Sequence, residues 1–112
     1  MRKIYIAGKI TGQEEQARIQ FAEAKHILSL RFPEAEIINP MNLPHNHDKS
    51  WESYMKECIA NLMQCDTIYL LEGFHNSKGA SIEYNLARKF HYTIKYQSSF
   101  SNQQSAIINH KS

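Results

Sequence analysis

The chain is poor in cysteine, in long apolar runs and in net charge of either sign. Its two cysteines, Cys58 and Cys65, fall in one predicted helical region, which argues against a disulfide framework and for a reducing cytoplasm. No apolar run approaches the roughly 20 residues that span a bilayer. With a net charge of +2 and no basic run interleaved with aromatics, we expect neither a membrane nor a nucleic-acid polymer as partner.

Common cofactor motifs are also missing. The stretch "GKITG" at residues 8–12 is neither Gly-x-Gly-x-x-Gly nor the Gly-Lys-Ser/Thr of a phosphate-binding loop. His45, His47 and Asp48 share a polar loop, but the sequence offers no fixed further ligand. We therefore expect no metal.

What remains is enough for one compact domain. The 112 residues are 42% hydrophobic and 21% charged, which excludes disorder as the default interpretation. After Tyr96 the composition turns to Ser, Gln and Asn, with Phe100, Ile107 and Ile108 as the only large apolar residues. We expect an α/β domain over residues 1–96 and a polar tail over residues 97–112, either mobile or docked on a neighbour.

Hydrophobic patterning predicts strands alternating with helices. Short β-branched or apolar runs predict strands at residues 3–8, 35–40, 66–73 and 92–96. Helical spacing predicts helices at about residues 14–31, at 51–64 with Ser50 as a possible cap, and from Ser77 onward. This order is typical of a small parallel sheet of about four strands flanked by helices, whose ligand crevice lies beyond the carboxyl ends of the strands.

One carboxylate, Glu83, falls on the apolar face of the last predicted helix. That face also carries Ala80, Ile82, Leu86, Ala87 and Phe90. Burial raises the pKa of a carboxyl group, whereas a nearby helix N-terminus favours its ionised form. Glu83 is therefore either a nucleophile toward an electrophilic sugar carbon or the partner of Arg2, Lys9 or Arg88 in an ion pair.

The turn before that helix contains Asn76, Ser77 and Gly79. A hydroxyl and a glycine at a strand-to-helix turn suit a phosphate or carboxylate bound by backbone N–H groups. The alternative is a capped helix start in which Gly79 only permits close packing.

The loop at residues 8–12 and two aromatic residues also leave alternatives open. The loop is either a tight turn or a backbone that admits a ligand, and Tyr5 and Trp51 belong either to the core or to an apolar ligand wall.

Five motifs in order carry a resemblance to a known family: "KIYIAGKITG", "INP", "SWESYM", "CDTIYLLEGF" and "SKGASIEYNLA". From about residue 3 to residue 90 the chain resembles short proteins described as a domain of unknown function. Those proteins are similar to nucleoside 2-deoxyribosyltransferases and 2'-deoxynucleoside 5'-phosphate N-hydrolases. The resemblance implies a Rossmann-like or flavodoxin-like fold, a deoxynucleoside or deoxynucleotide ligand, no cofactor, and a homodimer.

The resemblance also assigns roles. The pattern Ser-x-Gly-x-x-x-Glu of the N-hydrolases occurs here as Ser77, Gly79 and Glu83. By similarity Glu83 is the nucleophile that forms a covalent deoxyribosyl-enzyme, and Ser77 contacts a 5'-phosphate. The substrate-binding residues expected on this basis are Tyr5, Gly8, Lys9, Gly12, Asn76, Ser77 and Gly79.

The match to the relatives breaks at a second acid. They place an aspartate on the helix before the third strand, eight residues ahead of the aspartate that opens that strand. Here Asp66 opens the strand, so the corresponding position is Cys58, which lies on the apolar stripe of its helix. Glu57 would face away, and Asp66 itself would lie at the end of the strand opposite the crevice. Two hypotheses follow: an enzyme that cleaves or transfers the N-glycosidic bond, or a non-catalytic nucleotide-binding module.

Overall fold

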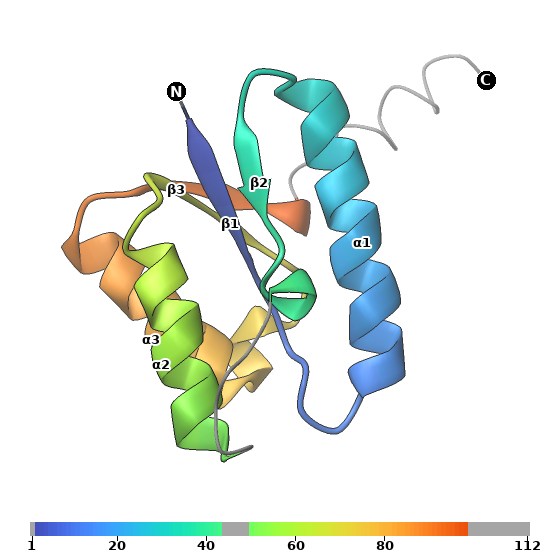
Figure 1. Ribbon diagram of the computed structural model, residues 1–112, viewed down its shortest axis with the longest axis vertical. Coiled ribbons are helices and arrows are strands. Elements are labelled where there is room, and N and C mark those ends of the chain that lie inside the picture. Colours follow the sequence, from blue (N-terminus) through green and yellow to red (C-terminus); the bar gives the residue numbers. More distant parts are fainter. Residues whose placement is uncertain (1, 44–49, 99–112) are drawn as a thin grey trace.

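The computed structural model describes residues 2–43 and 50–98, which form a parallel four-stranded sheet in the order β2-β1-β3-β4 (Figure 1). The strands are β1 (Lys3–Ala7), β2 (Glu36–Ile38), β3 (Thr67–Leu70) and β4 (Thr93–Tyr96). The helices are α1 (Glu14–Arg31), α2 (Trp51–Leu62) and α3 (Lys78–Lys89), with 3-10 turns η1 (Pro40–Asn42) and η2 (Phe74–Asn76). The predicted α/β class and order of elements are confirmed.

The central strand β1 is buried on both faces. Its side chains alternate, as in any strand. Ile4 and Ile6 pack in the cluster that contains the buried face of α1, whereas Tyr5 and Ala7 pack in the cluster formed with α2 and α3. This two-sided burial explains why the strand is a continuous apolar run in the sequence. It also directs Tyr5 toward the helix that carries Glu83.

The strand order reverses beside β1. The chain crosses through α1 to β2 on one side of β1 and later returns through α2 to β3 on the other side. Figure 1 shows α1 on one face of the sheet and α2 with α3 on the other. In open α/β sheets a ligand crevice forms at the carboxyl ends of the strands where such a reversal occurs.

One expectation is wrong, and two others fall on residues outside the described part of the chain. Phe90, expected on the buried stripe, is 60% exposed because α3 ends at Lys89 and Phe90 is its C-cap. The apolar residues of the tail, Phe100, Ile107 and Ile108, lie outside the described part of the chain, as does the loop with His45, His47 and Asp48. None of the described helices is long and apolar enough to cross a membrane.

Candidate active site

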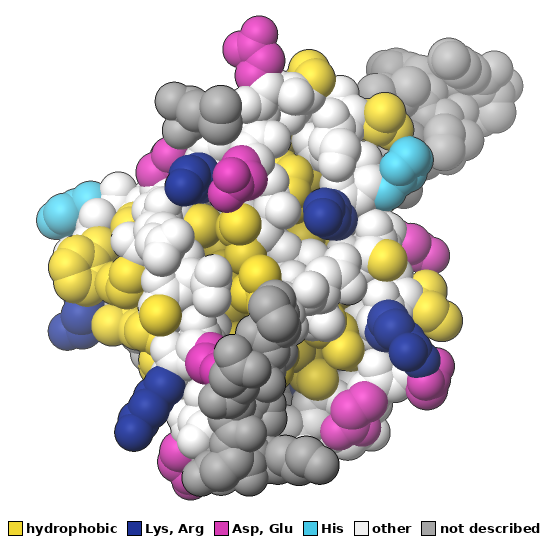
Figure 2. Space-filling view, in the orientation of Figure 1, with side chains coloured by type: hydrophobic (Ala, Val, Ile, Leu, Met, Phe, Trp, Pro, Cys, Tyr) yellow, Lys and Arg dark blue, Asp and Glu magenta, His cyan; other side chains and the backbone are white. Residues whose placement is uncertain are grey.

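A cavity of about 880 Å³ opens at the carboxyl ends of β1 and β3, between the first loop and the N-terminal turns of α2 and α3. All the predicted site residues except Gly12 line it: Tyr5, Gly8, Lys9, Asn76, Ser77, Gly79 and Glu83. In the space-filling view, which has the orientation of Figure 1, hydrophobic side chains are visible between the side of the molecule formed by α2 and the side formed by α1 (Figure 2). The structure therefore gathers residues from distant parts of the sequence at one cavity.

Glu83 lies on the buried face of α3, between Ala80 and Ala87, and is only 5% exposed. Its position follows from the start of the helix at Ser77, whose Oγ accepts a hydrogen bond from the backbone N–H of Ala80 at 3.2 Å. The capped helix start, one of the two alternatives for this turn, is therefore present, and it fixes the register that turns Glu83 inward. The side chain reaches the cavity wall.

The partner of Glu83 is a phenol. The Tyr5 hydroxyl donates a hydrogen bond to Glu83 Oε2 at 2.5 Å. Across residues 2–43 and 50–98, neither Arg2, Lys9 nor Arg88 forms an ion pair with Glu83. The ion-pair alternative is therefore wrong.

Burial dominates the electrostatics of this pair. It raises the pKa of Glu83 to about 8, and the hydrogen bond from Tyr5 opposes that shift only in part. Burial, and next the charge of Glu83, raise the pKa of Tyr5 well above its ordinary value. The net shift thus favours the neutral carboxyl group, although the nearby helix N-terminus was expected to favour the ionised form.

Cys58 faces the same cavity from α2 and is 2% exposed. Burial, and next the charge of Glu83, raise its pKa to about 11, while hydrogen bonds with Tyr5 and Tyr54 lower it in part. The prediction that Cys58 points into the site is confirmed. At neutral pH it is an uncharged thiol, so it cannot replace a carboxylate.

The two nearest acids in the sequence do not replace it either. Glu57, the neighbour of Cys58, is absent from the cavity lining. At the start of β3, Asp66 accepts hydrogen bonds from the Lys3 backbone N–H at 3.2 Å and from the Thr67 hydroxyl at 2.7 Å. As predicted, Asp66 therefore lies at the amino ends of the strands, at the end of the sheet opposite the cavity, where it connects the starts of β1 and β3.

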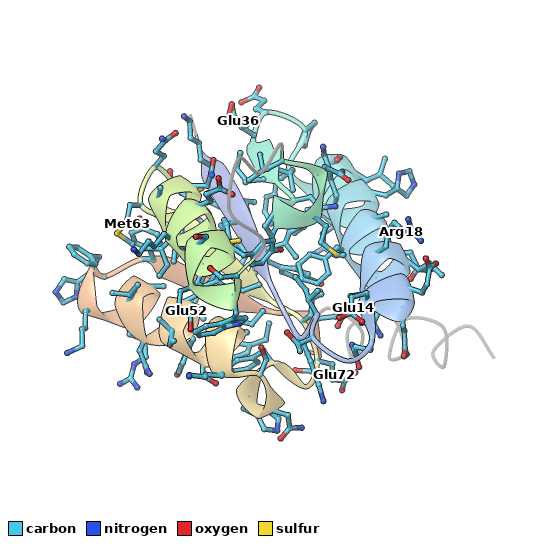
Figure 3. All side chains as sticks on the ribbon, turned by 60° about the horizontal axis from the view of Figure 1, so that its bottom comes forward. Glu14, Arg18, Glu36, Glu52, Met63 and Glu72 are labelled. Atoms are coloured by element: carbon cyan, nitrogen blue, oxygen red, sulfur yellow. The ribbon has the colours of Figure 1, made fainter. Side chains whose placement is uncertain are left out.

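Gly12 is the predicted residue that does not reach the cavity lining. It is exposed, has a φ of 85°, and its N–H donates to Glu14 Oε2 at 3.2 Å. The tight-turn alternative therefore describes Gly12, whereas Gly8 and Lys9 of the same loop line the cavity. Glu14, at the start of α1 (Figure 3), lines it as well.

Most of the cavity wall contributed by α2 was not predicted from the sequence. Ser50, Tyr54 and Met55 line the cavity together with Trp51, for which both alternatives had been left open. The spacing of Trp51, Tyr54, Met55 and Cys58 by threes and fours on one helix face was the available signal. Lys78, from the first turn of α3, was also missed.

Metal chemistry has no support among residues 2–43 and 50–98. No group of three or more His, Cys, Asp or Glu side chains in this part of the chain is placed to hold a metal ion.

The fold is that of solved 2-deoxyribosyltransferases. A 2-deoxyribosyltransferase from Leishmania mexicana matches with a TM-score of 0.64 and 16% identity over 86% of this chain and 63% of its own. The 2-deoxyribosyltransferase from Bacillus psychrosaccharolyticus matches with a TM-score of 0.63 and 18% identity over 84% of this chain and 70% of its own. The chain thus spans less than two thirds of the first of these neighbours.

Family membership comes from the sequence itself. Residues 2–96 match DUF4406, a domain of unknown function, and the chain belongs to that family. The resemblance to a domain of unknown function similar to deoxyribosyltransferases is therefore confirmed. A comparison with the curated proteins finds no match.

Proposed function

We propose that the chain cleaves or transfers the N-glycosidic bond of a 2'-deoxynucleoside or its 5'-monophosphate. The observation that carries this proposal is the inward-facing Glu83, held by the Tyr5 hydroxyl at the wall of the cavity with no ion-pair partner among the described residues. A buried carboxyl group without a cation is rare unless it serves a purpose. The similar solved structures are named as 2-deoxyribosyltransferases, which supports the substrate class.

In the proposed reaction, the ionised Glu83 attacks the anomeric carbon of the sugar. A carbon–oxygen ester bond forms while the bond from carbon to the base nitrogen breaks, and its electron pair leaves with the base, which takes up a proton. Water or a second base then attacks the same carbon, the ester bond breaks with its electron pair returning to Glu83, and the attacking group loses a proton, which balances the one taken up by the first base. Tyr5 keeps the carboxyl group in place, because its hydroxyl donates a hydrogen bond to Oε2.

The start of α3 is the proposed site for the sugar or its phosphate. Ser77 Oγ accepts a hydrogen bond from the Ala80 N–H, and its own proton remains able to donate to a ligand oxygen. Asn76, Gly79 and the backbone of the first loop at Gly8 and Lys9 border the same cavity. A helix N-terminus favours anions, which suits a 5'-phosphate.

Cys58 supports a second candidate function. Because residue 58 is a cysteine, the cavity has no carboxyl group at the position where the resemblance places an aspartate, and the acid that lines the cavity besides Glu83 is the exposed Glu14 at the start of α1. A protein with this cavity but without an acid at position 58 would bind deoxynucleotides without turning them over. The alternative is therefore a non-catalytic nucleotide-binding module.

We further propose that the chain works as a homodimer in a reducing cytoplasm. Both cysteines are free, which suits a reducing setting, and the resemblance implies sites built at subunit contacts. Light scattering tests the dimer, and a strict monomer would contradict it.

The decisive experiment compares base release by the wild type and by Glu83→Gln. A panel of 2'-deoxynucleosides and their 5'-monophosphates is incubated with each protein, and free base is measured chromatographically. We expect release by the wild type and a loss of about 1,000-fold or more in Glu83→Gln, because the variant cannot form the ester. Glu52→Gln, an exposed residue of α2 (Figure 3) outside the cavity lining, is the matched control. Binding without release by the wild type would favour the non-catalytic alternative.

A further inference from the structure

The chain contains a single tryptophan, Trp51, and it lines the cavity. It is the first residue of α2, which Ser50 caps by accepting a hydrogen bond from the Ser53 N–H at 3.1 Å. Unlike Met55 and Cys58 deeper on the same helix face, Trp51 is only half-buried. A half-buried indole in the lining of an apolar cavity leaves part of its aromatic surface open to a ligand.

The indole ring is held from one side by the first turn of α3. The Lys78 ammonium lies 4.6 Å from the centroid of the Trp51 ring, a cation–π contact. Gly79 follows, and a Cβ built there would lie 3.9 Å from Trp51 Cζ2 and 2.9 Å from Met55 Sδ. The missing side chain at Gly79 lets the two helices approach and brings Trp51 against the helix that carries Glu83.

Trp51 and Glu83 therefore border one cavity from two helices that meet at Gly79. A nucleoside whose anomeric carbon lies at Glu83 must project its base away from the carboxyl group, because the bond to the base breaks opposite the attacking oxygen. On the α2 wall, Cys58 and Tyr54 lie close enough to feel the charge of Glu83, and Trp51 follows one turn further along the same lining face. We infer that Trp51, steadied by Lys78, is the platform on which the nucleobase stacks.

This inference rests on the proposed function and specifies how the site recognises the nucleobase of its substrate. Stacking on an indole tolerates any base, since every base has a flat π-face. The site should therefore discriminate strongly between ligands with and without a base, and only weakly between one base and another. Lys78 reinforces the ring position rather than contacting the reacting atoms, so it is a positioning residue.

The lone tryptophan makes the test direct. Glu83→Gln, which removes turnover, is titrated with 2'-deoxyadenosine and thymidine 5'-monophosphates and with 2-deoxyribose 5-phosphate, while emission is excited near 295 nm to limit absorption by the bases. We expect saturable quenching by both nucleotides and none by the base-free sugar phosphate. Calorimetry on Glu83→Gln carrying Trp51→Leu should show nucleotide affinity about tenfold weaker, with sugar phosphate affinity unchanged.

Two further variants distinguish the loss of stacking from a loss of the folded structure. Trp51→Phe keeps an aromatic face and should retain most of the affinity, while Phe90→Leu removes an exposed aromatic side chain of the same chain outside the cavity lining and should change nothing. Nucleotide binding that neither quenches Trp51 nor weakens in a folded Trp51→Leu protein would overturn the platform while leaving the proposed function standing. If Glu83→Gln binds none of the probes and the wild type cleaves none, the proposed function falls and this inference with it.

Discussion

The Tyr5 hydroxyl and Glu83 Oε2 are joined by a hydrogen bond of 2.5 Å, which links the central strand of the sheet to the helix beside it. Tyr5 is fully buried and Glu83 nearly so. The pair combines two opposing demands, since burial favours the neutral carboxyl group while the phenol stabilises the carboxylate. The pH at which Glu83 loses its proton is set by this balance between burial and the hydrogen bond from Tyr5.

Activity should rise with pH up to about 8. The nucleophile must be ionised, and burial keeps the pKa of Glu83 near 8 in the free protein. Below that value kcat/KM for base release should fall about tenfold per pH unit, and above it should level off. A profile that is flat between pH 5 and pH 9 would contradict the assignment of Glu83 as the ionising group.

Tyr5→Phe should move that midpoint upward. The hydrogen bond from Tyr5 lowers the pKa of Glu83, so its loss leaves burial unopposed. Tyr92→Phe is the matched control, because it removes a hydroxyl that donates to the Leu62 carbonyl at 2.8 Å, outside the cavity lining. The measurement is the pH dependence of kcat/KM for the three proteins. An unchanged midpoint in Tyr5→Phe would show that the bond does not influence the ionisation.

The stability of the fold should fall as pH rises from about 4.5 to about 8. An unfolded glutamate loses its proton near 4.5, whereas folded Glu83 keeps it until about 8. In this window the folded state binds more protons, so raising the pH lowers the free energy of unfolding. Glu83→Gln stays neutral, so across this window its free energy of unfolding should rise relative to that of the wild type, by roughly a few kcal/mol. Urea denaturation at several pH values measures the difference, and parallel curves would refute it.

How much the sequence could reveal depended on the kind of signal. Alternation and helical spacing were sufficient to predict the helices and strands. The helical register of α3 was sufficient to predict that Glu83 faces inward, because local periodicity decides both. The identity of its partner was not accessible, since Tyr5 lies 78 positions away and meets Glu83 only through the packing of α3 on the sheet. The balance between burial and the helix N-terminus was likewise undecided, because it depends on how completely the cavity wall excludes water.

Cys58→Asp tests whether the missing acid limits the reaction. The substitution places a carboxyl group on the cavity wall, where it can assist departure of the base, and we expect base release to rise at least about tenfold. It should also cost stability, because a second buried acid is introduced near Glu83. Cys65→Asp is the control: Cys65 is also buried but does not line the cavity, so stability should fall with no gain in rate. A folded Cys58→Asp protein with unchanged activity would show that this position does not limit the reaction.

Gly8→Ala should damage both the fold and the site. A Cβ at Gly8 would lie 2.7 Å from Leu71 Cδ1 and 2.9 Å from Leu71 Cβ, so the ends of β1 and β3 must move apart. We expect a loss of about 1–3 kcal/mol in the free energy of unfolding, together with weaker substrate binding, because the first loop leaves β1 at this residue. Gly12→Ala provides the contrast. Its φ of 85° makes alanine unfavourable by about 1 kcal/mol, but nothing lies within 4 Å of the new Cβ and the residue does not line the cavity. Gly12→Ala should therefore be less stable but have an unchanged KM, whereas Gly8→Ala should be less stable and have a higher KM. Equal KM values in the two variants would mean that the backbone at the end of β1 does not shape the ligand site.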